Sequence, residues 1–241
     1  MPILRRPRLR APSSTAATLA DVDLRAYDFF DFGAGAGNTL RFWQKRFQAG
    51  RGLGIDISAE KIAIARERGR EVVHGDIRNI PEGTRVRFVS MMDFLEHLPD
   101  LEHVREMVGV AVRCARDFVF IRNPSFEDEA YLSALGLRQY WQDWAGHPSH
   151  LLLSDFASLF EELGVPAWTA NFKDPIFDSS DESIIPAGAP PDQLGYDPAI
   201  CGPKPFVRFD KPVFRQLDVI ACLSTKGFRE AREILRVAAP R

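Results

Sequence analysis

The stretch DFFDFGAGAGNTLRFW, residues 28–43, combines an acid with three glycines at a spacing suited to ligand binding. Asp31 stands two residues before Gly33, and Gly35 and Gly37 follow at alternate positions. Glycines allow backbone conformations and close approaches that a Cβ atom would prevent. An apolar run precedes them and a helical pattern follows, so we expect a ligand to lie against a strand-to-helix turn.

Three ligand classes make different demands on such a turn. A nucleoside triphosphate needs Lys-Ser or Lys-Thr after the last glycine, where this chain has Asn38-Thr39. A dinucleotide needs its third glycine five residues after the first, and Asn38 occupies that position. The Asp31 carboxylate would repel a pyrophosphate by on the order of 1 kcal/mol even under strong screening, and it would attract an ammonium group. S-adenosylmethionine has an ammonium, a sulfonium and no phosphate, and it suits this turn.

Strand-like and helix-like segments alternate around and after this turn. The pattern predicts strands at 27–33, 52–56, 71–76, 86–94, 117–123 and 214–225, and helices at 39–47, 59–68 and 228–238, with two more after Asp100 and after Ser154. Ser58 is the expected N-cap of the second helix, and Gly69 the expected glycine at its C-terminal end. This alternation predicts parallel strands joined by crossover helices.

From about Tyr27 to Gly164 the sequence resembles the class I S-adenosylmethionine-dependent methyltransferases, and it does so in four segments. DFGAGAG matches the motif whose acid and glycines hold the methionine end of the cofactor. Asp56, closing GLGID, matches the acid that receives both ribose hydroxyls. The remaining matches are Asp76 of HGDI for the adenine amino group, Ile57 and Ile77 for the two faces of the adenine ring, and Met92 and Asp93 of MMDFLEHL for the methyl-transfer side.

The resemblance implies an α/β fold with a doubly wound, seven-stranded, mostly parallel sheet of the Rossmann-like methyltransferase type. We expect a flexible basic arm at 1–20 and a single methyltransferase domain at 21–241. Within it, 27–125 would be the cofactor-binding core and 126–155 an acceptor-side segment. The stretch 174–212 is rich in proline and has little periodicity, which predicts a late cap or loop insertion.

Methyl transfer to a hydroxyl needs a group that removes a proton, and histidine is the usual supplier near neutral pH. His97, His147 and His150 are the candidate catalytic bases. His97 follows the fourth strand on the acceptor side, where it could serve the scaffold as easily as catalysis. We expect His74 to be structural and His103 to be solvated.

Aromatic residues gather in YWQDWAGHPSH, residues 140–150. Tyr140, Trp141 and Trp144 are the candidate acceptor-binding residues, since aromatic faces suit the apolar side of a sugar or another planar ring. The alternative is that the tryptophans pack a lid onto the core.

A divalent metal is a further candidate ligand. Asp93, Glu96 and His97 resemble an acid-x-x-Glu-His set that binds a divalent cation in some quinone-biosynthesis members. Oxygen and nitrogen ligands of this kind suit magnesium or zinc. Asp93 stands where that set has Glu, and its shorter side chain extends less far toward such a cation.

Composition narrows the function classes. The 241 residues are 45% hydrophobic and 27% charged, as in a soluble globular protein, and the net charge of −2 argues against a nucleic-acid partner.

NPSF, residues 123–126, lacks the second proline of the amino-group methyltransferase motif, and the chain has no Pro-Cys nucleophile pair. Three widely spaced cysteines indicate reduced thiols in a cytoplasm and no structural zinc site. No segment reaches the about 20 apolar residues of a membrane span, and no secretory signal is seen.

The sequence therefore predicts a cytoplasmic S-adenosylmethionine-dependent methyltransferase that methylates an oxygen of a small molecule or of a glycan or glycolipid intermediate. Two alternatives stay open. One is a non-catalytic cofactor-binding protein that regulates or scaffolds a partner. The other is an NAD(P)-dependent oxidoreductase, which the glycine spacing and Asp31 oppose.

Overall fold

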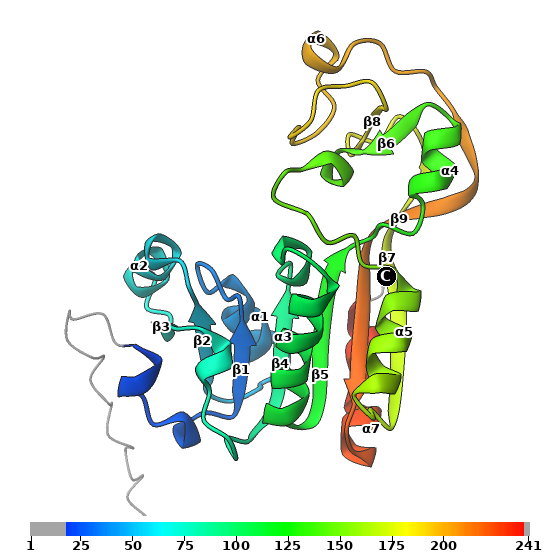
Figure 1. Cartoon of the computed structure of the whole chain (residues 1–241). Coiled ribbons are helices and arrows are strands. Elements are labelled where there is room, and N and C mark those ends of the chain that lie inside the picture. Colours follow the sequence, from blue (N-terminus) through cyan, green and yellow to red (C-terminus); the bar gives the residue numbers. More distant parts are fainter. Residues whose placement is uncertain (1–17, 239–241) are drawn as a thin grey trace, which may run out of the picture.

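A seven-stranded sheet forms the centre of the protein (Figure 1). The computed structural model describes residues 18–238 apart from three side chains, so the expected basic arm lies outside the described residues as far as residue 17. The strands, in the spatial order β3-β2-β1-β4-β5-β9-β7, are β1 Phe29–Phe32, β2 Gly52–Asp56, β3 Val72–His74, β4 Val86–Met92, β5 Ala115–Pro124, β7 Ala167–Asp178 and β9 Arg208–Cys222. Strands β1 to β5 run parallel, and β9 is antiparallel to both β5 and β7. The predicted seven-stranded, mostly parallel α/β sheet is confirmed.

Helices cover both faces of this sheet. The α-helices are α1 Asn38–Arg46, α2 Ala59–Glu67, α3 Leu101–Cys114, α5 Leu153–Glu162 and α7 Thr225–Ala238, and the 3-10 helices are η1 Leu19–Asp21, η2 Leu24–Ala26, η3 Ile77–Asn79, η4 Leu95–His97 and η5 Tyr140–Asp143. Buried residues of α3 and α5 pack on one face, and buried residues of α1, α2 and α7 pack on the other. The chain is therefore doubly wound.

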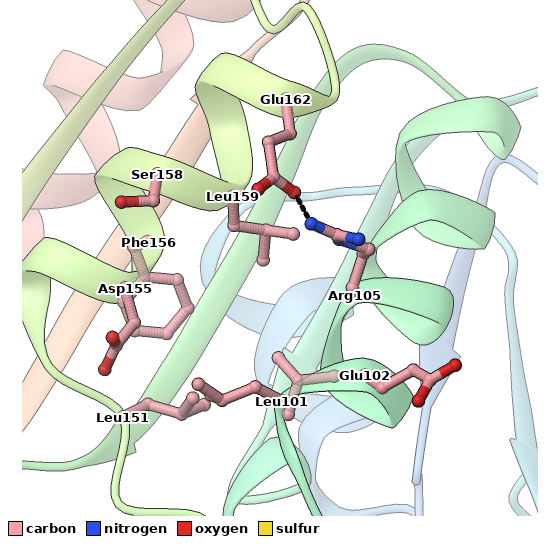
Figure 2. A pocket seen from close by; sticks show the side chains of 10 residues that line it. Leu101, Glu102, Arg105, Leu151, Asp155, Phe156, Ser158, Leu159 and Glu162 are labelled. Carbon is pink, nitrogen blue, oxygen red and sulfur yellow. Dashed lines mark hydrogen bonds and ion pairs between the residues drawn. The ribbon is translucent and has the colours of Figure 1, made fainter.

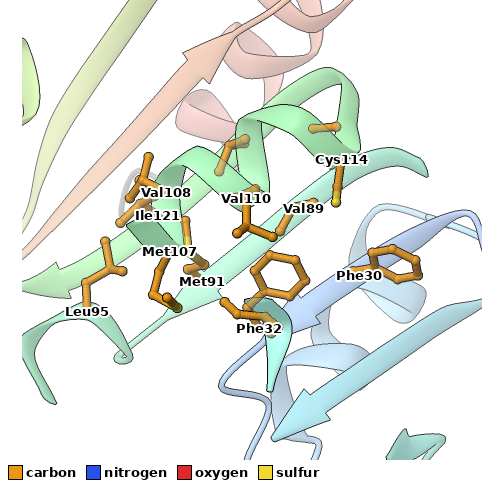
Figure 3. Packing of buried hydrophobic residues seen from close by; sticks show 14 of the residues in the cluster. Phe30, Phe32, Val89, Met91, Leu95, Met107, Val108, Val110, Cys114 and Ile121 are labelled. Atoms are coloured by element: carbon orange, nitrogen blue, oxygen red, sulfur yellow. The ribbon is translucent and has the colours of Figure 1, made fainter. Parts of the chain in front are cut away.

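The two faces follow from the alternation of side chains along each strand. In β1, Phe30 and Phe32 join the core under α3, which Figure 3 shows with Val89 of β4 and Met107 of the helix. On the opposite face, Phe29 begins an aromatic stack that runs across three neighbouring strands. Its ring lies 4.8 Å from that of Phe88, which lies 4.7 Å from that of Phe118. Apolar side chains on both faces bury the central parallel strands, and β1 and β2 are buried along their whole length.

Local end signals confirm several predicted boundaries. The Ser58 side chain accepts a hydrogen bond from the Lys61 backbone N–H, and Gly69 has φ +68° just after α2. Asp100 caps α3 by accepting from the backbone N–H of His103. Helix α5 begins at Leu153, one residue before the predicted Ser154.

The end of the chain differs from the prediction at two strands. Strand β7, AWTANFKDPIFD, was not predicted, although apolar and polar residues alternate from Trp168 to Lys173 before Pro175 interrupts the pattern. Strand β9 begins at Arg208, six residues before the predicted start. Both strands are stabilised by pairing with each other and, through β9, with β5. Those partners are far away in the sequence, so no local pattern marks them.

A cap lies beyond the carboxyl edge of the parallel strands (Figure 1). It contains α4 Glu129–Ala134, β6 Leu137–Gln139, β8 Ile184–Pro186 and α6 Pro198–Cys201. Strand β6 pairs with β8, so the acceptor-side segment and the proline-rich insertion, predicted separately, are hydrogen-bonded to each other. The cap has a small apolar core of its own, which includes Leu132, Leu137 and Ile184.

Two helical glycines give a matched test of this packing. A Cβ at Gly227 in α7 would lie 1.8 Å from the backbone oxygen of Asp117 in β5. We expect Gly227→Ala to push α7 off the sheet and to lower the free energy of unfolding by about 1–3 kcal/mol. A Cβ at Gly109 in α3 meets only Leu163, at 3.7 Å. Gly109→Ala should therefore raise the free energy of unfolding by up to about 1 kcal/mol. Urea unfolding of both variants measures these changes. If the free energy of unfolding changed in the same direction in both, the close packing of α7 on β5 would be contradicted.

Candidate active site

The glycine turn between β1 and α1 has the backbone conformation that its sequence predicts. Gly33, Gly35 and Gly37 have φ of +67°, +50° and +74°, a region that disfavours side chains. A Cβ at Gly33 would lie 2.4 Å from the ring of Phe94, so this glycine is required by packing. A Cβ at Gly35 would meet only Lys61, at 3.7 Å, so the turn is open to a ligand at this glycine.

The Asp31 carboxylate is buried next to this turn. It is 1% exposed, and its carboxylate accepts hydrogen bonds from Ser90 Oγ at 2.6 Å and from Thr39 Oγ1. The acid therefore ties β1 to β4 and to the first turn of α1. Each of its two oxygens accepts from one hydroxyl of the scaffold, and the predicted contact of this carboxylate with the cofactor ammonium stays a prediction.

Asp56 lies at the carboxyl end of β2 and faces the glycine turn. One of its oxygens accepts from the Gly35 backbone N–H at 2.7 Å, and the other accepts from the Ser58 N–H at 2.7 Å. A carboxylate oxygen has two lone pairs, so each can accept one further hydrogen bond from a ligand. Ile57, the next residue, is 74% exposed and offers an apolar surface beside it.

The residues predicted for the adenine ring lie differently from that prediction. Ile77 is 4% exposed and packs in the core, so only Ile57 presents a free apolar face. The Asp76 carboxylate accepts from the backbone N–H of Arg78 at 2.9 Å and forms an ion pair with its guanidinium. The hydrogen bond with Arg78 lowers the pKa of Asp76. An adenine amino group would have to share this carboxylate with Arg78.

A cavity of about 360 Å³ opens where the cap meets the carboxyl ends of β4 and β5. Most of the predicted acceptor-side residues line it: Asp93, Glu96, His97, Tyr140, Trp141, Trp144 and His147. They come from the segment after β4 and from the acceptor-side segment. Phe94, in the same segment as the cavity residues Asp93 and Glu96, packs against Gly33 of the glycine turn. Of the predicted cofactor residues, Met92 is partly buried under α1 and Asp93 lines the cavity.

The sequence left two alternatives for Trp141 and Trp144, a place in the acceptor site or packing of a lid, and the structure has both residues in packing contacts and in the cavity wall. Trp141 is 5% exposed and donates from Nε1 to the backbone oxygen of Ser125 at 3.1 Å. Trp144 donates from Nε1 to the backbone oxygen of Gln193, in the insertion, at 2.6 Å. Both indoles also line the cavity. They therefore hold the cap together while forming one wall of the cavity.

The candidate bases separate into two groups. The rings of His97 and His147 lie 4.9 Å apart in the cavity wall. Burial lowers the pKa of His147, and His97 beside it lowers that pKa further. His150 is not among the cavity residues: its ring stacks on Phe126, and its Nδ1 pairs with Glu129 at 2.7 Å. His74, predicted to be structural, is exposed with its Nε2 3.1 Å from the backbone oxygen of Ile57, and the His103 side chain is 44% exposed.

The three residues predicted to bind a metal are not the three whose ligand atoms lie together in the structure. Glu96, His97 and His147 offer ligand atoms that all lie within 4.8 Å of one another, so His147 takes the place expected for Asp93. Asp93 closes β4 with φ +51°, and its N–H donates to the backbone oxygen of Arg122 at 2.8 Å. Burial raises the pKa of Asp93, against the opposing effect of the Arg122 guanidinium.

Sequence reasoning missed the cavity residues from the antiparallel part of the sheet. Asp174, Arg215 and Gln216 line it from β7 and β9. No motif marks them, because β7 was not recognised as a strand and these residues reach the cavity only through its pairing with β9. Arg215 forms a bidentate pair with Asp181 of the insertion, at 2.7 and 2.8 Å.

A second cavity, of about 380 Å³, lies between α3 and α5 (Figure 2). Leu101 and Leu151 line it together with acidic side chains, and Arg105 pairs with Glu162 across it. Neither the glycine turn nor an imidazole borders this groove. The chemistry-bearing residues lie in the cavity under the cap instead.

Buried Asp31 predicts a pH dependence of stability. Burial raises the pKa of Asp31 to about 6, so the folded protein holds this proton more tightly than the unfolded chain. Its contribution to stability is complete below about pH 4 and is lost as the pH rises through about 6, by up to about 3 kcal/mol. Asn cannot titrate, so the unfolding free energy of wild type minus that of Asp31→Asn should fall between pH 4 and 7. Urea unfolding across that range measures it, and a constant difference would contradict the assignment.

Comparison with known proteins finds a similarity over part of the chain. A family model described as a methyltransferase domain matches residues 29–116. No curated protein matches the chain in sequence. A helix long and apolar enough to cross a membrane is not found among residues 18–238.

One solved structure shares the fold over most of this chain, and others resemble it less. A SAM-dependent methyltransferase from Archaeoglobus fulgidus is 16% identical with a TM-score of 0.57, covering 82% of this chain and 86% of that one. The YcgJ protein from Bacillus subtilis is 19% identical with a TM-score of 0.48, covering 63% and 68%. A magnesium protoporphyrin IX methyltransferase from Synechocystis is 14% identical with a TM-score of 0.44, covering 84% and 73%. Residues 29–116 thus match a methyltransferase domain, and the sheet around their glycine turn has the class I Rossmann-like fold.

Proposed function

We propose that the protein is an S-adenosylmethionine-dependent methyltransferase that methylates an oxygen of a small polar acceptor bound under the cap. One observation carries this proposal: the segment that lines the cavity under the cap also contacts the glycine turn. Phe94, which packs against Gly33, lies between Asp93 and Glu96 of the cavity wall. A cofactor seated on the turn would therefore present its methyl group close to whatever fills the cavity.

The groups at the turn suit this cofactor better than a dinucleotide. Asp56 keeps two lone pairs for adjacent ribose hydroxyls, Gly35 leaves room for the backbone to approach the ligand, and Ile57 offers an apolar face to the adenine. A cofactor without phosphates is compatible with two carboxylates, Asp31 and Asp56, at neighbouring strand ends. The sulfonium supplies the reactivity, and the protein aligns the acceptor.

The cavity suits an acceptor of sugar-ring size. Its volume of about 360 Å³ lies at the lower end of small-molecule sites. Tyr140 and Trp144 offer aromatic faces, while Asp93 and Asp174 offer acceptors for hydroxyl groups. This combination favours a glycan or glycolipid intermediate, or a small molecule of similar polarity. The imidazoles of His97 and His147 are the groups that can take the acceptor's proton, directly or through a bound cation.

Calorimetric titration with S-adenosylhomocysteine, alongside NADH, tests the cofactor. We expect micromolar binding of S-adenosylhomocysteine and none of NADH. Asp56→Ala removes charged hydrogen bonds to the ribose and should weaken binding by about 10- to 100-fold. Asp210→Ala, an exposed carboxylate of β9 in the cap, is the matched control and should bind like wild type. Binding of NADH alone would overturn the proposal.

Turnover separates the enzyme from a non-catalytic cofactor-binding protein. Wild-type protein with S-adenosylmethionine and a panel of sugars, glycosides and phenols should release S-adenosylhomocysteine with at least one class of acceptor. His97→Ala should lower that rate by about 100-fold or more and leave S-adenosylhomocysteine binding unchanged, since the imidazole acts on the acceptor. His103→Ala, an exposed imidazole of α3, should keep the wild-type rate. Equal rates in both variants would remove His97 from the reaction.

A further inference from the structure

Three potential metal ligands from two separate segments meet in the wall of the cavity. Glu96 and His97 belong to η4, after β4, and His147 follows η5 in the acceptor-side segment. Their ligand atoms all lie within 4.8 Å of one another, and all three residues border the cavity. The cluster thus sits where the cap closes on the parallel sheet.

Hydrogen bonds determine the tautomer of both imidazoles. His97 Nδ1 lies 2.7 Å from the backbone oxygen of Gly146, and His147 Nδ1 lies 3.2 Å from that of Trp141. A carbonyl oxygen can only accept, so in each ring Nδ1 carries the proton. In the neutral rings, Nε2 therefore keeps its lone pair. Histidines that bind metals are oriented in this way, with the second ring nitrogen donating to a carbonyl or carboxylate.

Glu96 supplies an independent observation. The residue is 1% exposed, and its Oε2 is buried without a hydrogen-bond partner. Its Oε1 lies 4.0 Å from His97 Nε2, which is too long for a hydrogen bond. A buried carboxyl group without a partner is costly, and native proteins rarely leave one in that state. A cation between the carboxyl group and the imidazoles would supply the missing partner.

We infer that Glu96, His97 and His147 bind one divalent cation of the zinc class. Two nitrogens and one oxygen form a donor set that suits Zn²⁺ or Co²⁺, whereas Mg²⁺ and Ca²⁺ prefer oxygen alone. Zinc binds nitrogen and oxygen at about 2.0–2.2 Å, so the side chains must close on the ion. The His97 side chain is 45% exposed, so its ring has solvent beside it and can shift toward the ion.

Three protein ligands leave a fourth position of such an ion for a ligand from the cavity. This is where the acceptor would lie, so the ion would polarise an acceptor oxygen beside the cofactor methyl group. That role rests on the proposed function, but binding of the ion does not.

The test is a titration of the tag-free, chelator-treated protein with Co²⁺, followed by its visible absorption. We expect one equivalent to bind with the intense bands of a four-coordinate site, to be displaced by Zn²⁺ and to be unaffected by excess Mg²⁺. His147→Ala and His97→Ala should each weaken Co²⁺ binding at least 10-fold. His103→Ala, which removes an exposed imidazole outside the cluster, should bind like wild type.

Circular dichroism and titration with S-adenosylhomocysteine accompany each variant. Both cluster variants should remain folded and keep wild-type affinity for that compound, which separates loss of the metal from loss of the fold or of the cofactor site. Glu96→Gln, which keeps the shape of the side chain, should also lose Co²⁺ affinity. Equal Co²⁺ affinity in wild type and His147→Ala, or no binding by wild type, would overturn the inference. Co²⁺ binding without S-adenosylhomocysteine binding would overturn the proposed function and leave the metal site standing.

Discussion

The buried ion pair between Arg122 of β5 and Asp218 of β9 is the interaction on which the rest of the site depends. Its two hydrogen bonds measure 2.6 and 2.8 Å, and Asp218 is fully buried. A buried carboxylate without its partner would cost about 3–5 kcal/mol, so the pair defines where the antiparallel strand meets the parallel ones. Because β9 continues from this point into the cap, the same pair sets the position of the cap over the carboxyl edge.

The cavity follows from that placement. Its walls come from the segment after β4, from the acceptor-side segment and from the ends of β7 and β9, which are brought together only when β9 pairs on both sides. Trp141 and Trp144 then connect the acceptor-side segment to its neighbours through their indole N–H groups. The residues that would recognise an acceptor are therefore also those that hold the cap closed.

At the glycine turn, carboxylates act mainly by organising the backbone. Asp31 reaches back to Ser90 and Thr39, and Asp56 accepts from Gly35 and Ser58. Each buried or half-buried carboxylate is satisfied by protein donors, as burial requires. The turn is thus shaped before any ligand arrives, which lowers the cost of ordering it on binding.

The sequence by itself determined the elements whose causes are local. The glycine turn, the caps at Ser58 and Asp100 and the succession of parallel strands and helices along the chain depend on neighbouring residues and their periodicity, and each agrees with the structure. Only the tertiary structure decided that β7 and β9 extend into a cap, that Ile77 is buried, and that His147 rather than Asp93 joins Glu96 and His97. These outcomes depend on contacts between residues far apart in the sequence; the partners in β7 and β9, for example, are separated by 30 to 55 positions. Alternation and capping carry no information about such pairs, because each partner satisfies its hydrogen bonds and buries its surface only against the other.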